Sequence, residues 1–141
     1  MKDAASATHV FTYGSLMFAP VWERVCRRSY SNQLARLAGH SRFALMGESY
    51  PAVVKAEHGT VSGRLYFNVD AQDVVRLDAF EGKEYQRVSN TVVLADGSTC
   101  LADHYLYQGP IPLADKDWDP AWFEREGIVK FMQTYCEQRG V

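Results

Sequence analysis

The chain contains little cysteine: Cys26, Cys100 and Cys136 are its three cysteines in 141 residues. An odd number of cysteines at wide spacing argues against a disulfide framework. It also argues against a metal or redox site of the CxxC kind. We therefore expect a reduced, cytoplasmic compartment for this protein.

Long apolar runs and an excess of one charge are also missing. No stretch approaches the roughly 18 apolar residues of a membrane span, and residues 1–8 lack the apolar segment of a signal peptide. We interpret residues 1–8 as a loose tail and expect no membrane partner. The formal net charge is −2, from 15 basic and 17 acidic residues. This balance argues against a nucleic-acid partner.

Metal and nucleotide motifs are absent as well. The histidines show no HExxH or similar ligand spacing, so we expect no metal site; they are His9, His40, His58 and His104. The GxGxxG and GxxxxGK[ST] patterns do not occur. Their absence argues against a Rossmann or P-loop nucleotide site.

What is present is a mixture of strand and helix patterns along one domain, residues 1–141. Strands are predicted at residues 10–13, 34–45 (bent near Gly39), 50–54, 61–69, 85–94 and 100–107. The last two are joined at Asp96-Gly97, a hairpin signal. Helices are predicted at residues 17–28, 70–80 and 120–138, the last one bent near Gly127. Because strands outnumber helices and the hairpin is antiparallel, the fold class is α+β.

The helix at residues 70–80 has clear boundary signals. Asp70 is the predicted N-cap, with Asp73 as its capping-box partner, and Gly82 is the stop signal. Apolar residues at helical spacing predict its buried face: Val74, Leu77 and Phe80. Before this helix, residues 61–69 alternate, which places odd-numbered and even-numbered side chains on opposite faces of a strand.

A strand-to-helix corner at Tyr13-Gly14-Ser15-Leu16 is the first candidate site. Backbone N–H groups at a helix entrance bind anionic oxygens, and glycine lets a ligand approach the backbone closely. A plain turn is the alternative. A second alternative is an amide hydrolase with Ser15 as nucleophile, which needs a histidine within about 3 Å of the hydroxyl. The corner lacks the second glycine of a GxSxG elbow.

Glu81 is the candidate general acid–base residue. It falls at the C-terminal end of the helix predicted at residues 70–80, directly before a glycine and between the aromatic residues Phe80 and Tyr85. The negative end of the helix dipole and partial burial both favour the neutral carboxyl, so we expect a raised pKa for Glu81. An ordinary solvated glutamate is the alternative, and Glu84 is the nearest competing carboxylate.

These two segments, taken with their order and spacing, resemble the γ-glutamylcyclotransferase-like superfamily in its short AIG2-like branch. The resemblance covers roughly residues 9–110. It is carried by the following residue runs: Phe11 to Leu16, Tyr50 to Ala52, Gly63 to Tyr66, Leu77 to Gly82, Tyr85 to Arg87, and Tyr105 to Tyr107.

The resemblance implies a mixed sheet that closes into a partial β-barrel with flanking helices. It also implies a cofactor-independent acyl transfer on a small-molecule γ-glutamyl substrate, in which the γ-glutamyl group cyclises to 5-oxoproline and a free amine leaves. Glu81 matches the family's catalytic carboxylate. The loop that holds the glutamyl group would comprise Tyr13, Gly14, Ser15, Leu16, Met17 and Phe18.

Tyr85 and Tyr107 are further candidates for the pocket lining. A non-catalytic module that binds or senses a small ligand on the same fold remains the alternative. The identity of the amine and the oligomeric state stay open at this stage.

Overall fold

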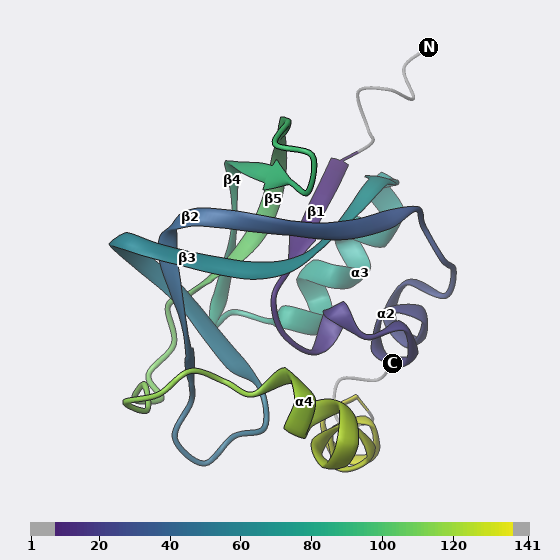
Figure 1. Ribbon diagram of the computed structural model, residues 1–141. Coiled ribbons are helices and arrows are strands. Elements are labelled where there is room, and N and C mark those ends of the chain that lie inside the picture. Colours follow the sequence, from purple (N-terminus) through teal and green to yellow (C-terminus); the bar gives the residue numbers. More distant parts are fainter. Residues whose placement is uncertain (1–7, 137–141) are drawn as a thin grey trace.

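A computed structural model describes residues 8–136, with side chains as far as Thr134. Within this range, five strands close into a barrel in the order β1-β3-β2-β4-β5, and helices cover part of its outside (Figure 1). The strands are β1 (Thr8–Thr12), β2 (Asn32–Ala44), β3 (Pro51–Val69), β4 (Tyr85–Leu94) and β5 (Thr99–Tyr107). The main helices are α2 (Ala19–Cys26) and α3 (Ala71–Glu81).

The sheet is mixed, and this confirms the predicted α+β fold. Strand β1 is antiparallel to β3 but parallel to β5, where Val10 pairs with Asp103, and this contact closes the barrel completely. The other neighbouring strands are antiparallel. No helix in the described part of the chain is long and apolar enough to cross a membrane.

Strands β2 and β3 form one long ribbon. The two predicted segments at residues 50–54 and 61–69 belong to a single strand of 19 residues. The residues between them are too polar to reveal a strand, but they extend the pairing with β2. The register shifts between Ala38 and His40, where Gly39 has a φ of 77°. Glycine adopts this left-handed conformation without strain, so the predicted bend is a bulge.

The apolar side chains form two layers on either side of the strands. The alternation predicted for residues 61–69 is confirmed as far as Tyr66, because Val61 and Leu65 pack inside the barrel while Tyr66 packs outside. It breaks at the end of the strand, after Asn68 with its φ of 54°, where Val69 packs in the same outer cluster as Tyr66. The ring of Tyr66 stacks on Trp22 of α2 at 3.6 Å between ring centroids. The interior layer is Phe11, Tyr13, Ala35, Leu37, Val53, Val61, Leu65, Val92 and Ala102.

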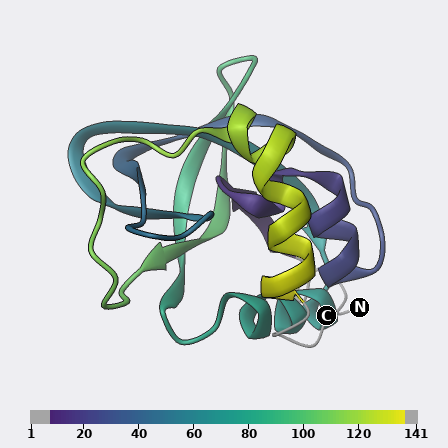
Figure 2. The ribbon, with the colours of Figure 1, turned by 90° about the horizontal axis from the view of Figure 1, so that it is seen from below.

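The C-terminal helical segment packs beside α2 and α3 (Figure 2). It starts at Pro120, with the Asp119 side chain as N-cap, and it includes π-helical turns. Its elements are α4 (Pro120–Trp122), η2 (Phe123–Gly127), α5 (Ile128–Phe131) and η3 (Met132–Cys136). The predicted bend near Gly127 is therefore a π-helical turn. Residues 137–138 of the predicted helix and residues 1–7 of the predicted tail lie outside the described residues, and Thr8 belongs to β1.

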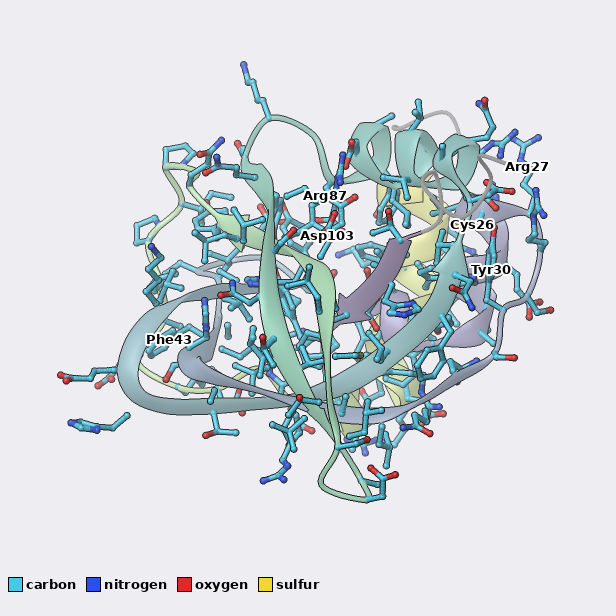
Figure 3. The ribbon with its side chains drawn as sticks, turned by 90° about the horizontal axis from the view of Figure 1, so that it is seen from above. Cys26, Arg27, Tyr30, Phe43, Arg87 and Asp103 are labelled. Carbon is cyan, nitrogen blue, oxygen red and sulfur yellow. The ribbon has the colours of Figure 1, made fainter. Side chains whose placement is uncertain are left out.

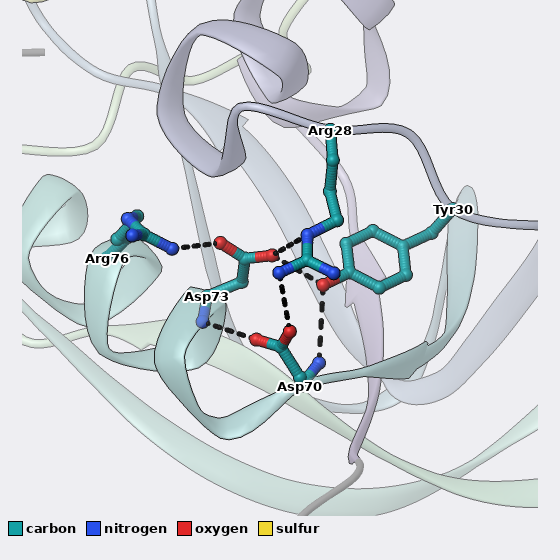
Figure 4. A network of polar contacts seen from close by, with 5 residues as sticks. All are labelled: Arg28, Tyr30, Asp70, Asp73 and Arg76. Atoms are coloured by element: carbon teal, nitrogen blue, oxygen red, sulfur yellow. Dashed lines mark hydrogen bonds and ion pairs between the residues drawn. The ribbon is translucent and has the colours of Figure 1, made fainter.

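A buried carboxylate ties α3 to the segment after α2 (Figure 4). Asp73 is fully buried, and it accepts hydrogen bonds from the Tyr30 hydroxyl and from Arg76 Nη1, the latter at 2.6 Å. Arg28 Nε lies 3.0 Å from Asp73 Oδ2. Burial and the bond to Asp73 raise the pKa of Tyr30 to about 12, so its hydroxyl remains a donor at neutral pH.

The predicted capping box is only half formed. Asp70 Oδ1 accepts the backbone N–H of Asp73 at 2.9 Å, as expected of an N-cap. The Asp73 carboxylate, however, binds the arginines, and the Tyr30 hydroxyl accepts the Asp70 N–H at 3.3 Å in its place. The tertiary contact from Tyr30 therefore replaces the local bond that a capping box would form between the Asp73 side chain and the Asp70 N–H.

We expect Asp70→Ala to lower the free energy of unfolding by about 1 kcal/mol, because an N-cap side chain satisfies a helix N–H that is otherwise unpaired. Asp70→Asn is the matched control, since asparagine caps as well as aspartate does. Urea unfolding of both variants measures the difference. Asp70 Oδ2 also lies 2.7 Å from Arg28 Nη2. Equal losses in the two variants would assign the effect to this ion pair instead of the cap.

Candidate active site

A pocket opens at one end of the barrel, between segments that are far apart in the sequence. The cavity itself is narrow, with a volume of about 30 Å³. The lining residues come from β1 and the turn after it, the start of β3, the end of α3, β4, β5 and α5. They are Phe11, Thr12, Tyr13, Gly14, Ser15, Leu16, Tyr50, Pro51, Phe80, Glu81, Tyr85, Tyr105 and Phe131.

The turn after β1 is held in place by three tertiary hydrogen bonds. The Tyr13 hydroxyl donates to the Tyr105 carbonyl at 2.6 Å, and Arg42 Nη1 donates to the Tyr13 carbonyl at 2.8 Å. The Tyr66 hydroxyl donates to the Leu16 carbonyl at 3.0 Å. Both ends of the turn are therefore anchored to neighbouring strands, and its backbone is organised before any ligand binds.

Gly14 lies directly against the opposite wall of the pocket. A Cβ atom at this position would come within 2.8 Å of Pro51 Cδ, so the close approach requires glycine. Pro51 is itself fixed, because its carbonyl accepts the Tyr85 hydroxyl at 2.7 Å. After Gly14 the chain enters the 3₁₀ turn η1 (Ser15–Met17). The first N–H groups of such a turn have no acceptor within it.

Glu81 is the last residue of α3, and its half-buried side chain lines the same pocket. Burial is the main cause that raises the pKa of Tyr13 well above its usual value, and the charge of Glu81 raises it further. The pKa of Tyr105 is also raised, first by burial, then by its bond to Asp78, then by the Glu81 charge. Both hydroxyls therefore stay protonated beside the carboxylate.

The structure brings together most of the predicted site residues. The pocket is lined by Tyr13, Gly14, Ser15, Leu16, Glu81 and Tyr85. Met17 and Phe18 lie instead along a broader hollow beside Trp22 of α2. Tyr107 is not a lining residue: its ring packs edge-on against Tyr85, and its hydroxyl accepts the Ile111 N–H at 2.9 Å. Glu84 is also absent from the pocket lining.

Sequence reasoning missed several aromatic walls of the pocket. Tyr50 and Tyr105 lie in two of the segments that carry the family resemblance, and this is the signal that could have identified them. Phe131 comes from the C-terminal segment, 50 positions after Glu81, and no local pattern assigns it to a site. Its edge-on contact with Phe80, at 6.1 Å between ring centroids, places it beside the end of α3.

The geometry does not favour Ser15 as a nucleophile. The described histidines have other neighbours: His40 contacts Ala38 and His104, and His9 accepts the Asn68 N–H. His58 is exposed beside Glu57. Within residues 8–136, no hydrogen bond links a histidine to the Ser15 hydroxyl, so the activating base of a serine hydrolase is missing there.

Metal-binding and redox chemistry likewise have no obvious site in the described chain. Over residues 8–136, no group of three or more histidine, cysteine, aspartate or glutamate side chains is arranged to hold a metal ion. Cys26 and Cys100 are both free. Burial raises the pKa of the Cys26 thiol to about 12, which makes it a packing residue.

Comparison with known proteins finds several that are similar to this chain. Residues 10–120 match the family model of "Gamma-glutamyl cyclotransferase, AIG2-like". The chain is 33% identical to AIG2-like protein A of Arabidopsis thaliana over 95% of its own length and 82% of that protein. With AIG2-like protein D of the same plant it shares 31% identity, over 98% and 95% of the two chains.

Solved structures agree with the fold. A solution structure of an Arabidopsis thaliana protein, 31% identical, has a TM-score of 0.71 and is covered over 91% of its length by 94% of this chain. A structure described as a gamma-glutamyl cyclotransferase has a TM-score of 0.68 at 14% identity, with coverage of 92% of this chain and 86% of that one. At that identity, the likeness concerns the fold alone.

Proposed function

Because the chain belongs to the AIG2-like gamma-glutamyl cyclotransferase family, we propose that it cyclises a small γ-glutamyl amine to 5-oxoproline and releases the free amine. One observation carries this proposal: Glu81 and the turn at residues 13–16 line one pocket, although more than 60 residues separate them in the chain. A base and an oxyanion site in the same cavity are what this reaction needs.

The reaction requires a proton to leave one nitrogen and to reach another. The substrate's α-amine attacks its own γ-carbonyl carbon, forming the ring C–N bond, and the amide C–N bond then breaks. A carboxylate takes the proton from the attacking nitrogen and returns it to the leaving nitrogen, so no net proton is consumed. Glu81 is the carboxylate among the lining residues, and we assign both transfers to it.

The turn after β1 is suited to bind the negative parts of the substrate. None of the described lining residues is basic, so the α-carboxylate and the developing oxyanion need hydrogen-bond donors from the backbone or from hydroxyls. The N–H groups at the start of η1 (Ser15–Met17) are such donors, and an oxyanion donor contributes roughly 3–4 kcal/mol to transition-state stabilisation. The anchored backbone also favours a folded, ring-closing substrate conformer.

A panel assay tests the proposed function. We expect the purified protein to release 5-oxoproline from at least one member of a set of γ-glutamyl amines that differ in their leaving group, with no added metal or cofactor. Chromatographic detection of 5-oxoproline and of the amine, in equal amounts, is the measurement. Tight binding of a γ-glutamyl compound without turnover would instead indicate a non-catalytic binding module. The cytoplasmic location expected from the cysteine content stays a prediction.

A further inference from the structure

Three charged side chains connect the end of α3, which carries Glu81, to β4 and β5. Arg87 Nε donates to Asp78 Oδ1 at 2.9 Å, and its Nη2 donates to Asp78 Oδ2 at 3.3 Å. The same guanidinium donates through Nη1 to Asp103 Oδ2 at 2.6 Å. Figure 3 shows Arg87 and Asp103 side by side on neighbouring strands. One arginine therefore holds a helix carboxylate and a strand carboxylate at once.

Asp78 is well placed to control the position of Glu81. The two residues are three apart on α3, so they lie on the same side of the helix, one turn apart. The Asp78 carbonyl accepts the Gly82 N–H at 3.0 Å, which is the i→i−4 bond that completes the last helical turn, the turn that carries Glu81. A shift of Asp78 would therefore move the last helical turn and the carboxylate on it.

Tyr105 connects these charged side chains to the rest of the pocket. Its hydroxyl donates to Asp78 Oδ1 at 2.7 Å, while its carbonyl accepts the Tyr13 hydroxyl at 2.6 Å. Tyr105, a buried residue of β5, is therefore hydrogen-bonded both to the turn after β1 and to the end of α3. None of Asp78, Arg87 and Asp103 lines the pocket, so they act on a ligand only through other residues.

From these contacts we infer that Asp78, Arg87 and Asp103 are positioning residues, which hold Glu81 in register with the turn after β1 through Tyr105. The inference rests on the proposed function for its kinetic consequence, but the placement of Glu81 is measurable without turnover. The Arg87–Asp78 pair is partly exposed, with side chains 36% and 42% exposed, whereas the Asp103 side chain is 13% exposed. A partly exposed pair adds little to global stability, so thermal unfolding of the variants separates its contribution to the site from a loss of folding.

The decisive variant is Arg87→Gln, with Arg76→Gln as its matched control. Arg76 is also paired with an aspartate of α3, Asp73, but it does not reach Asp78 or the pocket. We expect Arg87→Gln to lower kcat about tenfold with KM within about twofold, because misplacement of a reacting group acts on the chemical step. Arg76→Gln should change neither kinetic constant.

A second readout follows the Glu81 carboxyl carbon by NMR during a pH titration. Arg87→Gln leaves the charges of Asp78 and Asp103 uncompensated, which disfavours ionisation nearby, so the Glu81 midpoint should rise. Arg87→Lys restores the positive charge but not the bidentate hydrogen bonds to Asp78. The Glu81 midpoint should therefore return to the wild-type value, while kcat should recover only partly. The midpoint therefore reports the loss of the Arg87 charge, and the partial recovery of kcat in Arg87→Lys reports the loss of its hydrogen-bond geometry.

The outcomes separate the two proposals. If the wild-type protein releases no 5-oxoproline from any substrate, the proposed function fails, and the NMR titration still tests whether Arg87 acts on Glu81. An unchanged kcat and an unchanged Glu81 midpoint in Arg87→Gln would overturn the inference. A loss of kcat that matches Arg76→Gln and follows thermal stability would overturn it too. If Arg87→Gln does not fold, Asp78→Asn, which removes a negative charge at nearly constant shape, replaces it. In that variant kcat should fall as well, but the Glu81 midpoint should fall instead of rise.

Discussion

Glu81→Gln is expected to lower kcat for 5-oxoproline release by a factor of about 10²–10⁴, the usual contribution of general acid–base catalysis, and to leave the fold intact. The amide keeps the shape of the carboxylate but does not accept the proton of the attacking amine. KM should change far less, because the turn after β1 is expected to supply most of the substrate binding. Steady-state kinetics on a substrate found in the panel assay is the measurement.

Glu84→Gln is the matched control for Glu81→Gln. Glu84 lies three residues further along the chain and outside the pocket lining, so we expect wild-type kinetics from this variant. Circular dichroism and thermal unfolding check that both variants are folded. A reversed result, with Glu84→Gln inactive and Glu81→Gln active, would transfer the acid–base role to Glu84.

Acid is expected to destabilise the protein by about 3 kcal/mol between pH 7 and pH 4 through His104. This side chain is fully buried, and burial, followed by the charge of His40, lowers its pKa from 6.5 to about 4. Below the unfolded-state pKa, the unfolded chain binds a proton that the folded chain does not. The contribution of His104 to stability is therefore fully present above pH 6.5, and it is lost progressively as the pH falls toward the folded-state pKa.

The geometry around His104 explains why the folded protein keeps this ring neutral. The Asn90 side-chain nitrogen lies 2.8 Å from His104 Nε2, and the His40 ring stands edge-on at 5.0 Å between ring centroids. Protonation would place a charge in the barrel with no facing carboxylate among these contacts. Urea unfolding at several pH values measures the effect.

Between pH 7 and pH 4, the free energy of unfolding of His104→Leu is expected to fall by about 3 kcal/mol less than that of the wild type. This difference does not depend on the stability of the variant at neutral pH. His58→Leu is the control, because the His58 side chain is 93% exposed. It should keep the full pH dependence of the wild type. Parallel stability curves for the wild type and His104→Leu would assign acid sensitivity to other groups.

Much of the fold could be predicted from the sequence, because its signals are local. The Asp70 cap, the Gly82 stop and the Asp96-Gly97 hairpin depend on residues within a few positions of one another, and each occurs in the structure. The bulge at Gly39 belongs to the same group. The polar middle of β3 could not be predicted, because its strand conformation depends on pairing with β2 and not on its own residues.

The site divides in the same way. The corner at residues 13–16 and the helix end near Glu81 are predictable from the sequence, since turn and helix-end signals are short-range. That these segments share one pocket, that Phe131 lines it, and that Met17, Phe18 and Tyr107 do not, follows from the folded structure alone. The reason is barrel closure: the β1–β5 contact and the tyrosine bonds between strands join residues that no sequence period relates.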